Sequence, residues 1–402
     1  MAKLEVLARA PARLGAKVAS NVRDWADARR SGPWSNDSAA LAGVVTLLLI
    51  VGLVMSFSAS IVDAAEVGDP FIVFKRQLAW AIIGVPLFLI AAALDPKIWR
   101  TLAWPMLAFS LVMLFVVLTP AGIERQGSQR WFGFGPLLFQ PSELAKLATP
   151  LWLADVLARK RPKDGLPIEV RHLLVPAVPL LTVEAMLVMA EPDLGTTLLL
   201  AFIVGFVLFA EGLPLRWFAA GVAAVASLGL LAAIQAPYRL ARLNGWLDPE
   251  ADPLNSGFQL LQSLYAMGSG GWFGLGLGSS RGKWNFVPNP ETDFVFAIIG
   301  EELGLLGAIV VLAMFLALLV IGLRIARTAT TNFSRTVAWV ITAWIVGQGL
   351  LNIATVTGLM PITGVTLPLV SVGGSSMVST LVALGILAAI ARMTASTSRL
   401  TS

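Results

Sequence analysis

Long apolar runs separated by short polar connections dominate the chain. Each run has roughly 20 residues, the helix length that crosses about 30 Å of hydrocarbon. The alternating ten-residue segments of an outer-membrane barrel are absent. The pattern predicts an all-α polytopic membrane protein with ten transmembrane helices. We expect them near residues 39–57, 77–94, 100–118, 141–158, 173–190, 194–212, 214–235, 294–321, 336–357 and 371–391.

Lys and Arg are distributed unequally between alternate connections. If the N-terminus lies inside, 20 of the 29 fall on the inner side and 9 on the outer side. Because cytoplasmic loops carry an excess of Lys and Arg, both termini are predicted to be cytoplasmic. The large loop 236–293, between the seventh and eighth helices, is then extracytoplasmic. The same bias explains the net charge of +5, so no nucleic-acid partner is expected.

The composition agrees with one membrane domain. Hydrophobic residues make up 57% of the chain and charged residues 13%, against about 25% charged in soluble domains. We expect a basic N-terminal tail (1–38), a transmembrane domain (39–394) and a short cytoplasmic tail (395–402). The sequence of the N-terminal tail is compatible with an interfacial amphipathic helix and with a solvated segment. With no cysteine and one histidine, thiolate and multi-histidine metal sites are excluded.

The first segment with chemical potential is 127–146, on the outer side. Its Arg130 stands among aromatic residues, a composition that suits the membrane interface and lipid phosphates. Pro141 is placed to begin a helix, which puts Glu143 and Lys146 on one face. Each charge costs about 2.5–3.5 kcal/mol inside a span, so the two are expected to face a cavity or each other. A structural ion pair and a functional site are equally compatible with this pattern.

Two carboxylates, Glu191 and Asp193, flank Pro192 at an outer helix start. Asp193 is well placed to cap that helix, where an anion is stabilised by roughly 0.3–1 kcal/mol. Capping gives a structural explanation for Asp193. It gives none for Glu191, which is therefore a candidate for a binding role.

The large outer loop contains Arg239, Arg242, Gln259, a glycine-rich run at 268–278, Arg281 and Lys283. Glycines let a backbone approach a phosphate, but no strand precedes this run as in Walker or Rossmann motifs. A loop lying against lipid headgroups is the other interpretation. The basic residues nearby are candidates for binding a pyrophosphate.

Asp293 stands where this loop becomes an apolar helix. At about 100° per residue, Gly300, Gly304 and Gly307 project close to the Asp293 side of that helix. Glu301 is about 80° away and roughly 12 Å deeper. Because an intramembrane acid is a functional candidate, Asp293 and Glu301 are expected to face one cavity.

The last outer segment, 358–376, is rich in proline and glycine and includes Ser375. Broken backbone at membrane depth persists only beside protein or a wet cavity. Gln348 and Asn352 are polar groups on the preceding span. The segment is therefore expected to line a site.

Together these segments resemble the SEDS family of membrane peptidoglycan polymerases, to which FtsW and RodA proteins belong. The resemblance covers nearly the whole chain after residue 38 and is carried by 127–146, 191–197, 292–304 and 358–376. It implies polymerisation of lipid II into glycan strands on the outer face of the bacterial cytoplasmic membrane, with release of undecaprenyl pyrophosphate. The division-associated FtsW branch fits better than the elongation-type RodA branch, which implies cell-wall synthesis at the division septum.

The resemblance also implies residue roles. Asp293 matches the catalytic aspartate of the family. Glu143 and Lys146 match the Glu and Lys that follow the family's Gln-Pro-Ser motif. Two departures are Glu291, where members often have His, and Val372, where many have Tyr. The residues expected to bind substrate are Arg130, Glu143, Lys146, Glu191, Asp193, Arg239, Gln259, Arg281, Lys283, Glu301 and Ser375.

The implied mechanism uses Asp293 as the general base on the acceptor sugar hydroxyl. Basic residues of the outer loop would stabilise the leaving pyrophosphate, with a divalent cation (Mg or Mn) as a candidate helper and no organic cofactor. A helix N-terminus would lower the pKa of Asp293, whereas burial or Glu291 would raise it. Expected partners are lipid II, a class B penicillin-binding protein and other division proteins. The alternatives are a lipid II flippase and a scaffold for division proteins.

Overall fold

The computed structural model describes residues 35–66, 68–125, 127–134, 137–161, 168–284, 287 and 290–401. Most of the predicted N-terminal tail lies outside these ranges, so both interpretations of that tail stay predictions. Four residues shortly before Asp293 (285, 286, 288 and 289) also lie outside them.

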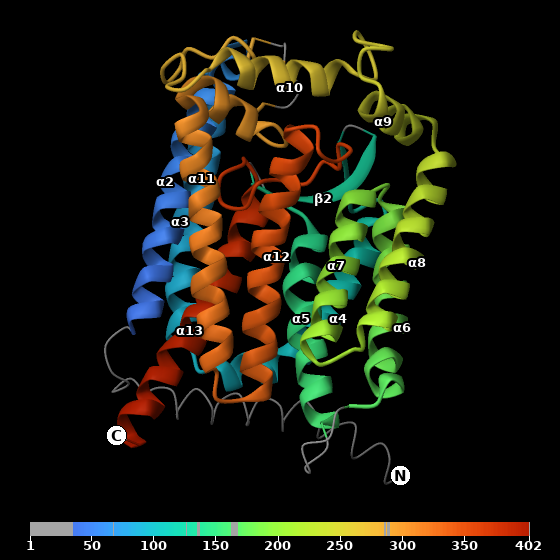
Figure 1. Cartoon of the computed structure of the whole chain (residues 1–402), viewed down its shortest axis with the longest axis vertical. Helices are drawn as coiled ribbons and strands as arrows, with labels where there is room; N and C mark the ends of the chain where they lie inside the picture. Colours follow the sequence, from blue (N-terminus) through green and yellow to red (C-terminus); the bar gives the residue numbers. More distant parts are fainter. Residues whose placement is uncertain are drawn as a thin grey trace.

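Long helices run side by side as a bundle (Figure 1). In the described part of the chain, eight helices are long and apolar enough to cross a membrane. The chain is thus a mostly helical, multi-pass membrane protein, as predicted. The eight are α2 (Asn36–Glu66), α3 (Ile72–Ala93), α4 (Pro96–Val117), α6 (Val170–Ala190), α8 (Leu215–Ile234), α11 (Val295–Thr328), α12 (Asn332–Val356) and α13 (Gly374–Thr401).

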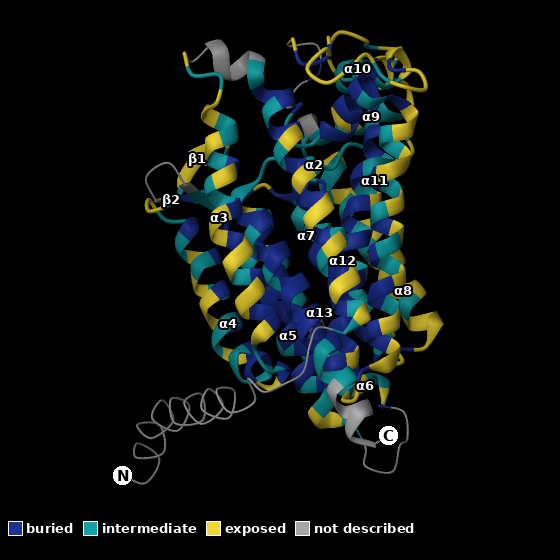
Figure 2. Ribbon diagram, turned by 90° about the vertical axis from the view of Figure 1, so that its left-hand side faces the viewer, coloured by how far each residue is buried: buried dark blue, intermediate teal, exposed yellow. Residues whose placement is uncertain are grey.

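The other two predicted spans coincide with α5 (Pro141–Lys160) and α7 (Leu194–Ala210). Helix α7 has only 17 residues, and α5 carries charged residues along its length. The polar positions of α5 are tolerated because it lies inside the bundle, against α4, α6, α7, α12 and α13. Figure 2 shows buried residues along its course. The count of ten spans stays a prediction.

The end of the bundle opposite the end of α13 carries β2, α9 and α10 (Figure 1). A small antiparallel sheet of β1 (Ile123–Arg125), β2 (Ser128–Phe134) and β3 (Leu137–Phe139) corrects the all-α expectation. Its strands are too short to stand out beside the long apolar runs. The predicted large loop contains α9 (Pro237–Leu247) and α10 (Phe258–Ser269).

Helix α11 is broken at Gly304, which has φ 69° and ψ −167°. The loop 271–276 replaces the helical hydrogen bonds lost there. The amides of Leu305 and Leu306 donate to the carbonyls of Gly271 (2.9 Å) and Trp272 (3.2 Å). On the other side of the break, the amides of Leu275 and Gly276 donate to the carbonyls of Glu301 (2.9 Å) and Glu302 (3.0 Å). The break therefore joins the glycine-rich loop to α11.

Replacing Gly304 with Ala is expected to destabilise the protein. A Cβ there would lie 2.4 Å from the Gly274 amide nitrogen, and the backbone conformation is strained for any other residue. Such conformations cost about 1–3 kcal/mol, and the overlap adds to that cost. Thermal unfolding in detergent measures the effect. The control is Gly43→Ala in α2, where a Cβ meets nothing within 4 Å; an equal Tm for both variants would contradict the expectation.

Candidate functional site

Asp293 lies just before α11, whose N-cap is Phe294. Its position is set by Asn352 of α12, which is fully buried. The Asn352 side-chain nitrogen donates to the carbonyl of Asp293 at 2.8 Å and to that of Val365 at 2.8 Å. One amide group thus connects the start of α11 with the broken outer segment before α13.

A second set of bonds holds the residues before Asp293. The Ser371 hydroxyl donates to the carbonyl of Thr292 at 2.5 Å, and the Val372 amide donates to the carbonyl of Glu291 at 2.8 Å. Gln77 of α3 in turn bonds the backbone of Ser371. The backbone at Asp293 is therefore fixed by buried groups from three parts of the chain.

The surroundings of the Asp293 carboxyl favour its neutral form. Its removal from water is the largest influence and raises the pKa to about 6. The positive charge of Arg242 lowers the pKa, the negative charge of Asp193 raises it, and the positive charge of Arg130 lowers it. Burial therefore outweighs the lowering by the two arginines. Arg242, in α9, is one of the basic loop residues that the sequence named as candidates for binding a pyrophosphate.

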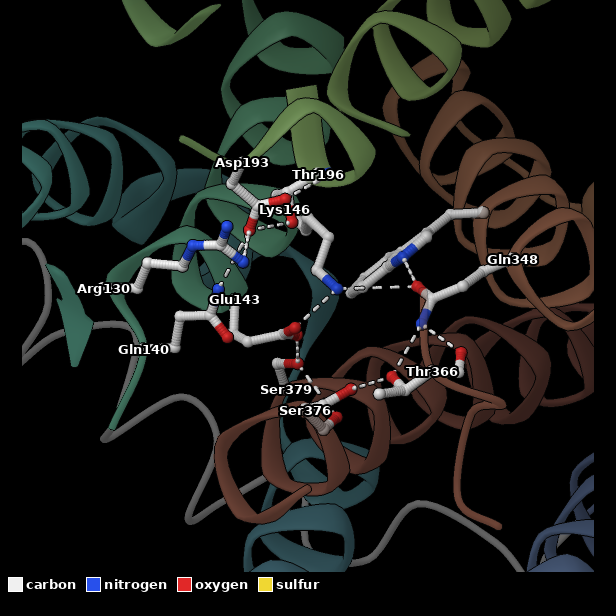
Figure 3. Close-up of polar contacts among 11 residues, drawn as sticks. Arg130, Gln140, Glu143, Lys146, Asp193, Thr196, Gln348, Thr366, Ser376 and Ser379 are labelled. Atoms are coloured by element: carbon white, nitrogen blue, oxygen red, sulfur yellow. Dashed lines mark hydrogen bonds and ion pairs between the residues drawn. The ribbon is translucent and has the colours of Figure 1, made fainter. Parts of the chain in front are cut away.

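Arg130 of β2 holds the turn between α6 and α7 (Figure 3). Its guanidinium donates to the carbonyls of Glu191 (2.9 Å) and Pro192 (2.8 Å) and pairs with the Asp193 carboxylate at 3.3 Å. Asp193 also accepts from the Thr196 amide at 3.0 Å, so it caps α7 as predicted. The sheet and the α7 N-terminus are thereby joined next to Asp293.

Glu191 is fully buried. Neither of its carboxylate oxygens has a hydrogen-bond partner within the described residues. Burial, followed by the negative charge of Asp193, raises its pKa to about 8 against the opposing effect of Arg130. Burial thus favours the neutral form of Glu191.

Glu143 and Lys146 face each other, one of the two arrangements expected (Figure 3). Their Oε1 and Nζ atoms are 2.8 Å apart, and both side chains are buried. Ser379 of α13 donates to Glu143 Oε2 at 3.0 Å, and Lys146 Nζ lies 3.5 Å from Gln348 Oε1 of α12. A buried pair offsets its desolvation only with such additional bonds. The pair thus connects α5, α12 and α13 inside the bundle.

Glu301 is buried and bonded to the loop that follows α10, and the expectation that it shares a cavity with Asp293 stays a prediction. Glu301 accepts from the Ser280 hydroxyl (2.5 Å) and the Arg281 amide (2.8 Å) of the outer loop. The neighbouring Glu302 pairs with Lys283 at 3.3 Å. Asp293 precedes the first residue of α11, so the angle estimated for a continuous helix from Asp293 to Glu301 does not apply.

The remaining predicted residues are spread over the end of the bundle that carries α9 and α10. Arg239 of α9 bonds the carbonyl of Ala232 at 3.2 Å, and Gln259 is half-buried on α10. Ser375 is buried in the first turn of α13. Arg281 is exposed, whereas Lys283 is buried in its ion pair. Among the described residues, no group of three or more acidic or histidine side chains is arranged to hold a metal ion.

The Glu191→Gln variant is expected to gain stability relative to the wild type as the pH rises. A buried acid with a raised pKa keeps its proton in the folded state after the unfolded chain has lost its own. The wild type therefore loses stability between about pH 4.3 and its folded pKa of about 8, and the Gln variant does not. Tm values measured at pH 5 and pH 8 test this difference. A Tm gap that is equal at both pH values would contradict it.

Comparisons with known proteins agree with this architecture. The family model for FtsW, RodA and SpoVE, described as cell cycle protein, matches residues 38–396. The probable peptidoglycan glycosyltransferase FtsW of Mycobacterium tuberculosis is 39% identical over 94% of this chain and 73% of its own length. Stage V sporulation protein E of Bacillus subtilis is 40% identical over 87% of this chain and 95% of its own.

Solved structures show the same fold. One comes from work on the structural coordination of polymerization and crosslinking by a peptidoglycan synthase complex. It has a TM-score of 0.71 and 32% identity, covering 88% of this chain and 97% of that chain. Thermus thermophilus RodA has a TM-score of 0.65 and 29% identity over 88% of this chain and 95% of its own. This chain therefore belongs to the FtsW/RodA/SpoVE family, as its motifs predicted.

Proposed function

We infer that this protein is a peptidoglycan glycosyltransferase that joins lipid II units into glycan strands and releases undecaprenyl pyrophosphate. Its similarity to FtsW proteins along most of its length supports this activity. The observation that carries the chemical assignment is Asp293, whose backbone is fixed by buried bonds and whose pKa is raised to about 6. A base with a pKa near the working pH is effective in proton transfer.

Asp293 acts as the general base in this proposal. Its carboxylate takes the proton from the acceptor sugar hydroxyl, whose oxygen attacks the anomeric carbon of the donor. The bond from that carbon to the pyrophosphate oxygen breaks, and the pyrophosphate leaves with the bonding electrons. The charges of Arg242 and Arg130, both felt by Asp293, are placed to stabilise this leaving anion.

A divalent cation, Mg or Mn, fits this site only with help from the substrate. The described residues provide no group of three acidic or histidine ligands. Such hard cations accept one or two carboxylates together with substrate phosphate oxygens. Asp293 would supply the carboxylate, and the cation would neutralise charge on the pyrophosphate.

The relatives support several finer assignments. We propose ten membrane spans with the α9–α10 loop outside, a location at the division septum, and other division proteins and a class B penicillin-binding protein as partners. The many relatives named FtsW favour the division branch over a RodA-like role. A structural relative from a complex that combines polymerization with crosslinking supports a transpeptidase partner.

Asp293→Asn is expected to abolish lipid II polymerisation by purified protein in detergent with its transpeptidase partner. Loss of a general base lowers the rate by about 10²–10⁴-fold. In the wild type, the rate should rise with pH up to about 6 and then level off, because the unprotonated form is the base. Asp248→Asn, an exposed acid of the same loop, is the control. Polymerisation at the wild-type rate by the Asn variant would exclude the base role. The same assay tests the flippase alternative: detergent solution has no two sides, so a protein that only moves lipid II across a membrane would form no polymer.

Asn352→Ala is expected to lower kcat with little change in KM. It leaves the carbonyls of Asp293 and Val365 without their donor, which costs about 1–3 kcal/mol per buried group and releases the backbone at Asp293. The acidic limb of the pH profile should also shift, because the carboxyl is no longer held in place. Thr342→Ala is the control, since this buried α12 hydroxyl bonds only its own helix at Ala338. An unchanged kcat and pH profile in Asn352→Ala would contradict the positioning role.

A further inference from the structure

Large apolar side chains are exposed on residues 271–284 of the outer loop, here named the aromatic segment. The exposed fractions are 64% for Trp272, 81% for Phe273, 60% for Leu277 and 62% for Trp284. In water, such a concentration of exposed aromatic and aliphatic groups is costly and marks an interaction site.

The membrane-facing surface of α11 extends to the edge of this segment. Residues 303–323 contain no charged residue and lie between Glu302 and Arg324. At 1.5 Å per residue this run is about 31 Å long, which matches the hydrocarbon thickness of about 30 Å. Leu305, Leu306 and Ile309 at its outer end are exposed. The outer edge of the hydrocarbon therefore lies near the break at Gly304.

The aromatic segment lies at that level. The carbonyls of Gly271 and Trp272 accept hydrogen bonds from the amides of Leu305 and Leu306. Trp272 is therefore bonded directly to a residue of the exposed apolar face of α11. Figure 1 shows the loop beyond α10 at the outer end of α11. Trp and Tyr are enriched at this depth in membrane proteins because their rings are amphipathic.

The charges of this region suit a lipid surface as well. Glu301 and Glu302 are turned inward, where Ser280, loop amides and Lys283 satisfy them. Arg281 is exposed between Leu277 and Trp284. The outward surface therefore offers apolar groups and one cation, and a cation near the headgroups is attracted to lipid phosphates.

We propose that the aromatic segment is an interfacial anchor, which inserts Trp272, Phe273, Leu277 and Trp284 into the headgroup–acyl boundary of the outer leaflet. The anchor ties the outer loop to the bilayer at the break in α11. It is independent of the proposed chemistry at Asp293.

The absence of cysteine from the chain allows a direct test. Phe273→Cys carries a nitroxide label in the full-length protein, reconstituted into vesicles of phosphatidylethanolamine and phosphatidylglycerol. Leu254→Cys is the matched control, because Leu254 is also 81% exposed but lies between α9 and α10. The ratio of collision rates with oxygen and with a water-soluble nickel chelate reports depth. We expect this ratio to be several-fold higher at position 273 than at position 254.

Equal ratios at the two positions would overturn the proposal, because the segment would then lie in water. A label at 273 that is water-exposed in vesicles and shielded only after addition of the transpeptidase partner would also overturn it and indicate a protein-docking surface. As a second measurement, Trp272→Phe and Trp284→Phe should each reduce the quenching of tryptophan fluorescence by lipids brominated near the headgroup. Unchanged quenching in both variants would contradict insertion.

Discussion

The hydrogen bonds of Asn352 are the interaction on which the site depends. An unpaired backbone group in hydrocarbon costs several kcal/mol, so irregular segments at membrane depth must find partners inside the protein. Asn352 satisfies the carbonyls of Asp293 and Val365, and Ser371 satisfies that of Thr292. The requirement for backbone satisfaction thereby also fixes the carboxyl that we assign as the base.

The same requirement organises the other side of α11. Gly304 interrupts the helix, and the loop 271–276 supplies the hydrogen bonds that the helix loses. Glu301 and Glu302 then accept from the following part of the loop and from Lys283. A long loop that is irregular in sequence is therefore rigidly attached to a membrane helix, and Asp293 at the start of that helix shares this support.

The sequence predicted those features that depend on local pattern. Apolar runs located the helices, and Asp193 was recognised as a cap. Glu143 and Lys146 were expected to face a cavity or each other, and they pair. The bonds of Glu301 to Ser280 and Arg281 could not be predicted, because they depend on a loop about 20 residues earlier in the chain. The small sheet was missed for a related reason, since the pairing of short strands depends on tertiary contacts.

The charges around Asp293 form a consistent whole. Burial favours the neutral form of Glu191, and the charge of Asp193 is balanced by Arg130 and used to cap α7. Arg242 adds a positive charge near Asp293. Among the described residues, Arg242 forms no ion pair with a carboxylate, unlike Arg130. Three acids near one point would repel a pyrophosphate if all were ionised and unpaired. In the proposed mechanism only Asp293 has to ionise, so the site would accept an anionic donor and still keep a base with a pKa of about 6.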